Sequence, residues 1–243
     1  QATAIRRFFD SVKPETVNLG PSSFCGIDRA RGDLYCLMPK WQSVPSRALR
    51  VAMKSPVSVI RALDQSVCWI ENPGAAAKIK CRGEKGPTGW VNDRILPQAY
   101  DLQTGGPWAC ARSKTEARCW TTRDEASLPQ DFVTARNWAS NADGICALTH
   151  DGRVTCADPV TGQIVSSGFG LGIPQEFSTP NPDNQELWIG NSTACVRDSQ
   201  ARLHCWSWWN PTATLIPFTR PIQNVVGSGY TPCAILDNGQ AEC

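Results

Sequence analysis

Twelve cysteines in close pairs constrain this 243-residue chain more than any other feature of its sequence. Taken in order, the two cysteines of each pair are 9 to 13 residues apart, and each pair encloses a segment that can turn. Zinc sites need tighter Cys-x-x-Cys or Cys/His clusters, which the sequence lacks, so we expect no metal and no cofactor. We predict six local disulfides: Cys25–Cys36, Cys68–Cys81, Cys110–Cys119, Cys146–Cys156, Cys195–Cys205 and Cys233–Cys243.

The segment between Cys146 and Cys156 has the pattern of a β-hairpin. Two short runs of strand-favouring residues flank the turn signal Asp151-Gly152. If Gly152 takes the left-handed conformation of a three-residue loop, Cys146 lies directly opposite Cys156. Opposed Cα atoms are then about 4.5–5.5 Å apart, which is within the range of a disulfide. Because residues 233–243 have the same spacing, a disulfide-linked hairpin is predicted to be the repeating unit.

The repeat has a period typical of blade architectures. The first cysteine of each pair recurs every 36 to 49 residues. Upstream of the hairpins, an aliphatic residue precedes a proline; since proline cannot donate to a ladder, these segments are predicted to be outer edge strands. A second strand with a glycine-containing turn follows, as at residues 101–105. The prolines of the edge segments are Pro97, Pro129, Pro174 and Pro217.

Six such units predict an all-β, six-bladed β-propeller of four-stranded antiparallel blades, with one hairpin disulfide per blade. We expect residues 1–243 to form a single domain, with hairpins at 25–36, 68–81, 110–119, 146–156, 195–205 and 233–243. Residues 3–8 resemble residues 214–218, and no outer strand follows Cys243. An N-terminal strand near residues 3–9 is therefore predicted to close the last blade.

The repeat also resembles a known family. Its pattern, Val-Val-x-Gly followed by Cys-Ala-Ile/Leu, a turn with Asp or Asn before Gly, and a second Cys, is clearest at 225–243, 146–156 and 195–206. This is similar to the repeat of the regulator of chromosome condensation propellers, and most similar to the cysteine-bearing versions in ectodomains of crinkly-type plant receptor kinases and in secreted or bacterial proteins. The resemblance implies a propeller over essentially the whole chain. It does not imply the GTPase and chromatin partners of nuclear members, because paired cysteines indicate an oxidising setting.

Composition excludes several functional classes. The chain is 41% hydrophobic and has no apolar run long enough to span a membrane, which is typical of a soluble globular protein. Its net charge of +2 comes from acids and bases spread along the sequence without a basic stripe, so we expect no nucleic-acid partner. The disulfides place the protein in an extracellular, secreted, ectodomain or periplasmic setting.

Three tryptophans form the densest aromatic cluster of the sequence: Trp206, Trp208 and Trp209. They are candidates for a ligand-binding surface, stacking on a sugar or anchoring a protein. Trp206 has an alternative role in the core of the repeat, because Trp120 also follows the second cysteine of its pair. Adjacent strand residues point to opposite faces, so at least one of Trp208 and Trp209 is a candidate for exposure.

Two short motifs are further candidates for sites. Arg31, Gly32 and Asp33 form a cell-adhesion tripeptide near the tip of the first hairpin, although a turn glycine between solvated charges explains the same residues. Asn191 begins the sequon Asn-Ser-Thr and is a candidate for N-glycosylation.

No set of residues predicts catalysis. The two histidines, His150 and His204, lie in different predicted hairpins, and the cysteines are accounted for as structural pairs. We therefore expect a non-catalytic, extracellular protein-recognition module, with an extracellular protein or a glycan as its partner. The alternatives are a lectin that uses exposed tryptophans and a structural subunit of an extracellular assembly.

Overall fold

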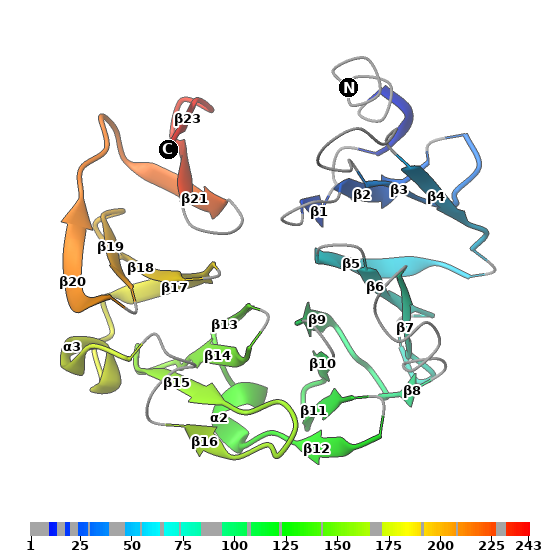
Figure 1. Ribbon diagram of the computed structural model, residues 1–243, viewed down its shortest axis with the longest axis horizontal. Coiled ribbons are helices and arrows are strands. Elements are labelled where there is room, and N and C mark those ends of the chain that lie inside the picture. The colour runs from blue at the N-terminus through cyan, green and yellow to red at the C-terminus, as the bar shows by residue number, and fades with distance from the viewer. Residues whose placement is uncertain are drawn as a thin grey trace. The chain divides into compact units, whose positions relative to one another are not determined.

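The strands of this chain form six separate antiparallel sheets, as the computed structural model in Figure 1 shows. Among the described residues, no helix is both long and apolar enough to cross a membrane. The structure describes residues 10–13, 18–19, 24–28, 30–38, 47–53, 55–63, 66–72, 74–83, 94–105, 108–121, 123–141, 143–165, 172–190, 192–207, 209–226 and 232–243.

The first three sheets each have four strands in sequential order across the sheet. The first sheet contains β1 (Asn18–Leu19), β2 (Phe24–Ile27), β3 (Leu34–Met38) and β4 (Arg47–Val51). The second contains β5 (Val57–Leu63), β6 (Ser66–Glu71), β7 (Lys78–Gly83) and β8 (Arg94–Ile95). The third contains β9 (Asp101–Thr104), β10 (Ala109–Arg112), β11 (Ala117–Trp120) and β12 (Glu125–Ser127).

The remaining sheets follow the same order, and the sixth has three strands among the described residues. The fourth contains β13 (Asn137–Ser140), β14 (Ile145–Leu148), β15 (Val154–Ala157) and β16 (Ile164–Val165). The fifth contains β17 (Asn184–Ile189), β18 (Thr193–Asp198), β19 (Leu203–Ser207) and β20 (Asn210–Ile216). The sixth contains β21 (Ile222–Val226), β22 (Cys233–Leu236) and β23 (Ala241–Glu242).

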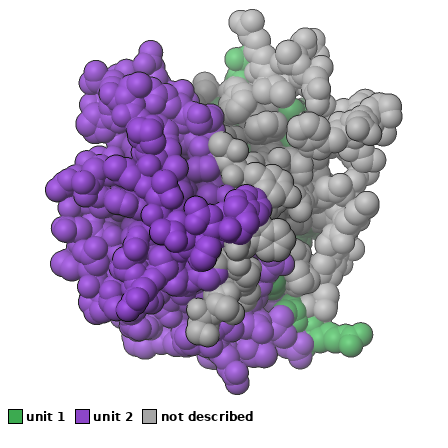
Figure 2. Space-filling model, turned by 60° about the vertical axis from the view of Figure 1, so that its left-hand side comes forward, with its two compact units in different colours: residues 1–113, 121–123 green, residues 114–120, 124–243 purple. Residues whose placement is uncertain are grey.

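Two compact units divide the chain, and each is described by itself. Unit 1 comprises residues 1–113 and 121–123, and unit 2 comprises residues 114–120 and 124–243. Figure 2 colours unit 1 green and unit 2 purple. The single domain over residues 1–243 stays a prediction.

A disulfide links the two central strands in each of the first five sheets and joins β22 to the residue after β23 in the sixth, which confirms the six predicted pairs. Cys146 lies directly opposite Cys156 in the ladder between β14 and β15, with Cα atoms 3.9 Å apart. The same opposition joins Cys195 to Cys205 at 4.1 Å, and no cysteine is free. The other links are Cys25–Cys36, Cys68–Cys81, Cys233–Cys243 and the third sheet's pair of Cys110 and Cys119.

The turn predicted at residues 150–152 is also confirmed. Gly152 has a φ of 81°, and its N–H donates to the carbonyl of Thr149 at 3.0 Å. The N–H of Thr149 donates in turn to the carbonyl of Arg153 at 2.8 Å. Gly239 closes the last hairpin in the same way with a φ of 81°, so one turn geometry recurs along the chain.

The prolines lie beyond the outer strands rather than within them. Pro217 follows the last residue of β20, and Pro97 lies two residues after the end of β8. Pro129 and Pro174 instead precede two short helices that the sequence analysis missed, α2 (Gln130–Val133) and α3 (Gln175–Ser178). The fixed φ of proline suits the start of a helix, which explains the difference. The closing strand predicted near residues 3–9 lies outside the described residues.

Apolar side chains from neighbouring sheets pack against one another within each unit. In unit 1, Leu34 of the first sheet shares a buried cluster with Val67 and Trp69 of the second. In unit 2, Leu148 and Leu187 pack between the fourth and fifth sheets. Every residue of β14 and β15 is buried, because both faces of the fourth sheet are covered.

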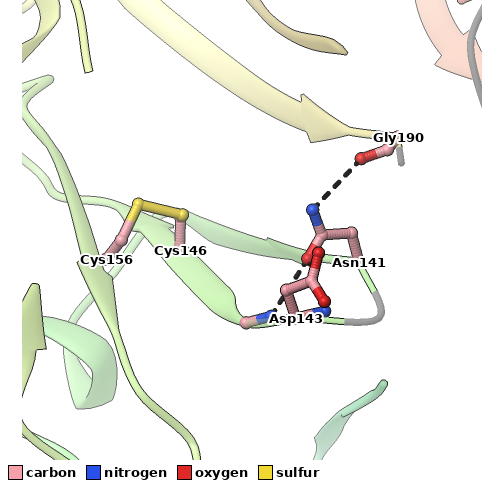
Figure 3. Close-up of a disulfide and its surroundings, with 6 residues drawn as sticks. Asn141, Asp143, Cys146, Cys156 and Gly190 are labelled. Atoms are coloured by element: carbon pink, nitrogen blue, oxygen red, sulfur yellow. Dashed lines mark hydrogen bonds between the residues drawn. A yellow bond between two sulfur atoms is a disulfide. The ribbon is translucent and has the colours of Figure 1, made fainter. Parts of the chain in front are cut away.

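Polar side chains also join the fourth and fifth sheets. The amide of Asn137 donates to the carbonyl of Leu187 at 2.8 Å and accepts from its N–H at 3.1 Å. Figure 3 shows a second link, in which the Nδ2 of Asn141 donates to the carbonyl of Gly190 at 3.4 Å. The Oδ1 of Asn141 accepts from the N–H of Asp143 at 2.9 Å and so closes the turn before β14.

A pair of glycine substitutions separates backbone strain from steric exclusion. At Gly239 an added Cβ meets nothing within 4 Å, so Gly239→Ala should cost only the strain of a positive φ, about 1 kcal/mol. At Gly152 the Cβ would lie 1.6 Å from the carbonyl oxygen of Asn181, so Gly152→Ala should cost about 3 kcal/mol or more. Denaturant unfolding with the disulfides intact measures both costs. Equal losses of unfolding free energy for the two variants would contradict the close contact between Gly152 and the carbonyl of Asn181.

Candidate functional site

The hairpin tips carry the exposed side chains that differ most between the sheets. Their backbone turn recurs, whereas the residues at their tips do not, so any specific recognition by the tips depends on these side chains. Arg31 is exposed at the first tip. The exposed pairs at the others are Ala75 and Ala76, Lys114 and Thr115, His150 and Asp151, Ser199 and Gln200, and Asp237 and Asn238.

Trp206 lies in the hydrophobic core of unit 2 and not on its surface. Its side chain is 4% exposed and stacks on Phe177, with ring centroids 5.0 Å apart. The helix α3 supplies Phe177 from within the long connection before the fifth sheet. This corrects the candidate binding role of Trp206 and matches the alternative that it fills the core, because a ligand cannot reach a ring that is covered on both sides.

Trp209 is the exposed member of the tryptophan cluster, with 65% of its surface accessible. It lies in the turn between β19 and β20, where the N–H of Asn210 donates to the hydroxyl of Ser207 at 3.2 Å. Trp208 lies outside the described residues. A binding role for Trp209 stays a prediction.

The tripeptide of Arg31, Gly32 and Asp33 forms the tip of the first hairpin, where Arg31 and Gly32 are exposed and Asp33 is half-buried. Asp28 holds this turn: its Oδ1 accepts from the N–H of Arg31 at 3.0 Å, and its Oδ2 pairs with Arg50 at 2.5 Å. The hydrogen bond from Arg50 keeps the pKa of Asp28 below its ordinary value. The turn is therefore tied to its sheet, and an adhesion role for its residues stays a prediction.

A second buried carboxylate, Asp198, organises the tip between β18 and β19. It accepts from the side chain of Arg202 at 2.7 Å and lies 3.1 Å from the Nε2 of His204. Burial alone would raise the pKa of Asp198, but hydrogen bonds from Arg202 and His204 outweigh it, and the pKa lies below its ordinary value. His204 is thus part of a structural network.

His150, by contrast, lies exposed at the tip of the fourth sheet, where its carbonyl accepts from Arg136 at 2.7 Å. The two histidines come from different sheets, as the sequence predicted. In the described part of the chain, no three His, Cys, Asp or Glu side chains form a group that could hold a metal ion. The glycosylation candidate Asn191 lies outside the described residues and stays a prediction.

Comparison with known proteins identifies the fold. No protein-family model and no curated protein matches the sequence. Among solved structures, the CRINKLY ectodomain of the Arabidopsis thaliana receptor kinase ACR4 matches with a TM-score of 0.58 and 15% identity, over 90% of this chain and 73% of that one. The ectodomain of the Physcomitrella patens receptor kinase CR4 matches with a TM-score of 0.64 and 16% identity, over 92% of this chain.

A yeast RCC1 protein, Prp20, is equally similar in fold. Prp20p from Saccharomyces cerevisiae matches with a TM-score of 0.64 and 12% identity, over 92% of this chain and 68% of that one. The present chain spans 58% of the length of the Physcomitrella ectodomain. The neighbours thus include both propeller groups that the repeat resembles, and the fold of this chain is that of a disulfide-linked β-propeller.

The Asp28 turn predicts a specific dependence of stability on pH. Because the pKa of Asp28 is lowered by folding, its contribution is present above its ordinary value of 3.8 and is lost as the pH falls through the folded value. Asp28→Asn keeps an acceptor for the turn but removes the charge that pairs with Arg50. It should lower the free energy of unfolding at neutral pH, and the difference from wild type should shrink below about pH 4.

Urea unfolding measured across this pH range tests the prediction. Asp143→Asn is a suitable control, because Asp143 is exposed and ion-pairs with no cation among the described residues; it should change the stability at neutral pH by no more than about 0.5 kcal/mol. A difference for Asp28→Asn that stays constant into acid would show that the ion pair is not its cause.

Proposed function

We propose that this chain is a non-catalytic protein-recognition module that acts outside the cytoplasm, as a secreted or periplasmic protein or as part of an ectodomain. The observation that carries the proposal is one disulfide in each of six propeller sheets, a feature of an oxidising compartment, in a fold shared with receptor ectodomains. Neighbours at this level of identity establish the fold only, so the recognition role rests on the surface of this chain.

The hairpin tips support recognition by protein contacts. A disulfide-linked hairpin holds each tip, so little conformational entropy is lost when a partner binds there. The exposed side chains at the tips include cationic, anionic, amide and small apolar groups, a mixture suited to a polar protein epitope. Prp20p, whose binding to Gsp1p and histones is described, shows that this fold also serves protein binding elsewhere.

Catalysis finds little support in the same residues. His204 is engaged with Asp198 and packs its ring edge against Phe177 at 6.4 Å. His150 is exposed, and the acid next to it, Asp151, accepts a hydrogen bond from Thr149. A hydrolytic site would need a nucleophile within hydrogen-bond distance of a histidine. The hydrogen bonds of His204 and His150 described above include no such nucleophile.

A lectin is the second candidate function, because Trp209 presents an exposed indole. An exposed aromatic face can stack on the apolar face of a sugar ring. Trp206 cannot contribute, since its ring is buried, so such a site would consist of one turn rather than several repeated positions.

Site-directed photo-crosslinking tests the recognition role. A photoreactive residue at Ala76 reports on an exposed tip of unit 1, and the same residue at the exposed Glu176 of α3 reports on a position of unit 2 away from the tips. In the native extracellular milieu we expect a specific adduct from the tip, and the purified adduct partner should bind the wild-type chain with a Kd of about 1 μM or tighter. A purified partner that fails to bind, or substrate turnover abolished by His204→Ala in a folded protein, would contradict the proposal.

A glycan array tests the lectin alternative. If this alternative is correct, the wild-type chain binds at least one glycan, and Trp209→Ala reduces that binding about tenfold or more, because stacking on an indole contributes roughly 1–3 kcal/mol. Leu215→Ala, which removes another exposed apolar side chain of the same sheet, serves as the control and should leave binding unchanged. Array binding that survives Trp209→Ala would exclude this site.

A further inference from the structure

The two units carry opposite net charges. Unit 1 contains 17 Lys and Arg against 9 Asp and Glu, a net charge of +8. Unit 2 contains 7 against 13, a net charge of −6. The charge of +2 for the whole chain therefore conceals a partition that the sequence analysis did not detect, because the position of the boundary follows from the tertiary contacts.

Both units contain ion pairs, but they differ in which exposed arginines are left without an acidic partner. In unit 2, most arginines are neutralised by carboxylates at 2.6–3.0 Å, and Arg136 is bound by backbone carbonyls. In unit 1, three exposed arginines have no acidic partner in the described part of the chain: Arg31, Arg82 and Arg123. The paired arginines of unit 2 are Arg118, Arg153, Arg197, Arg202 and Arg220.

Strand β7 concentrates positive charge on one face. Lys78, Lys80 and Arg82 alternate with the buried Ile79 and Cys81, so the three cations share a face. Lys80 is directly opposite Trp69, and Arg82 is opposite Val67, in the ladder with β6. Both of these partners belong to the cluster between the first and second sheets, so the cations lie beside that cluster. We call Lys78, Lys80 and Arg82 the β7 basic face.

Acidic groups interrupt this positive surface at close intervals. Glu71 ion-pairs with Lys80, and Asp33 is two residues from Arg31. A sulfated or phosphate polymer carries an anion at every repeat. Some of these anions would therefore lie next to the carboxylates of unit 1 and be repelled by them. A protein surface of mixed charge can place carboxylates opposite the arginines and cations opposite the acids.

We propose that unit 1 binds a protein with an acidic epitope, with Arg82 of the β7 basic face as the principal contact and with Arg31 and Arg123 adding to the positive charge that attracts the partner. This inference rests on the proposed function and specifies the chemistry of its partner. Guanidinium groups without an internal acid can bind carboxylates in a bidentate geometry. The net charge of unit 1 accelerates and orients the encounter with an acidic surface.

Binding to immobilised poly-L-glutamate tests the charge of the surface in the intact, disulfide-bonded protein. We expect binding at 50 mM NaCl that weakens about tenfold or more at 500 mM, where screening shortens the range of exposed charges. The triple variant Arg31→Glu, Arg82→Glu and Arg123→Glu should bind about tenfold more weakly at low salt, with Arg82→Glu the most damaging single change. These side chains are exposed, so far-UV circular dichroism and the Tm should match wild type.

Lys114→Glu is the matched control, because Lys114 is exposed at a tip of unit 2 and lacks an acidic partner in the described part of the chain. It should change binding less than about twofold. An equal loss for Lys114→Glu, or a triple variant that binds as wild type does, would overturn the assignment to unit 1. A triple variant that loses heparin or duplex DNA but keeps poly-L-glutamate would overturn the assignment to carboxylates.

The purified photo-crosslinking partner separates this inference from the proposed function. If the triple variant loses binding to that partner and Lys114→Glu keeps it, the result supports both the recognition function and the acidic-epitope inference. A partner that binds the triple variant as tightly as wild type overturns the acidic-epitope inference and leaves the recognition function in place.

Discussion

The disulfide between directly opposed residues of each central hairpin is the interaction on which the rest of the structure depends. A two-stranded hairpin is marginally stable alone, and a sheet of three or four short strands gains most of its stability by packing against another. Closing a loop of about ten residues removes entropy from the unfolded chain and contributes roughly 2–3 kcal/mol. Because the disulfide also fixes which residues lie opposite each other in the hairpin, it determines which side chains point to each face of the sheet.

Packing between sheets then decides which side chains remain for binding. The fourth sheet is covered on both faces, so its central strands are buried throughout, and the aromatic ring of Trp206 is taken into the same core. Amides such as Asn137 satisfy the backbone of the next sheet and are equally unavailable. The side chains left exposed for binding therefore lie at the tips, in the turns, on the outer strands and at positions such as Arg82 near the end of β7.

Charge shows why a whole-chain average conceals a functional feature. Acidic and basic residues are both frequent along the sequence, and their sum is close to zero. The boundary between the units divides these residues into a unit of net positive charge and a unit of net negative charge. Arginines of unit 2 pair with carboxylates of the same unit, whereas the exposed arginines without an acidic partner in the described part of the chain belong to unit 1. A surface that is positive overall but interrupted by carboxylates favours a protein partner over a regular polyanion.

The sequence by itself determined the local structure: the six disulfides and the glycine turn at Gly152 follow from residues at most 13 apart, whose geometry the chain fixes directly. Only the tertiary structure decided that Trp206 is buried, that Trp209 is exposed and that Pro129 and Pro174 precede α2 and α3. Burial of a tryptophan depends on what the next sheet and an intervening helix place over it. Asp28 likewise acquires its ion-pair partner, Arg50, from a strand 22 residues further along the chain, which no local pattern specifies.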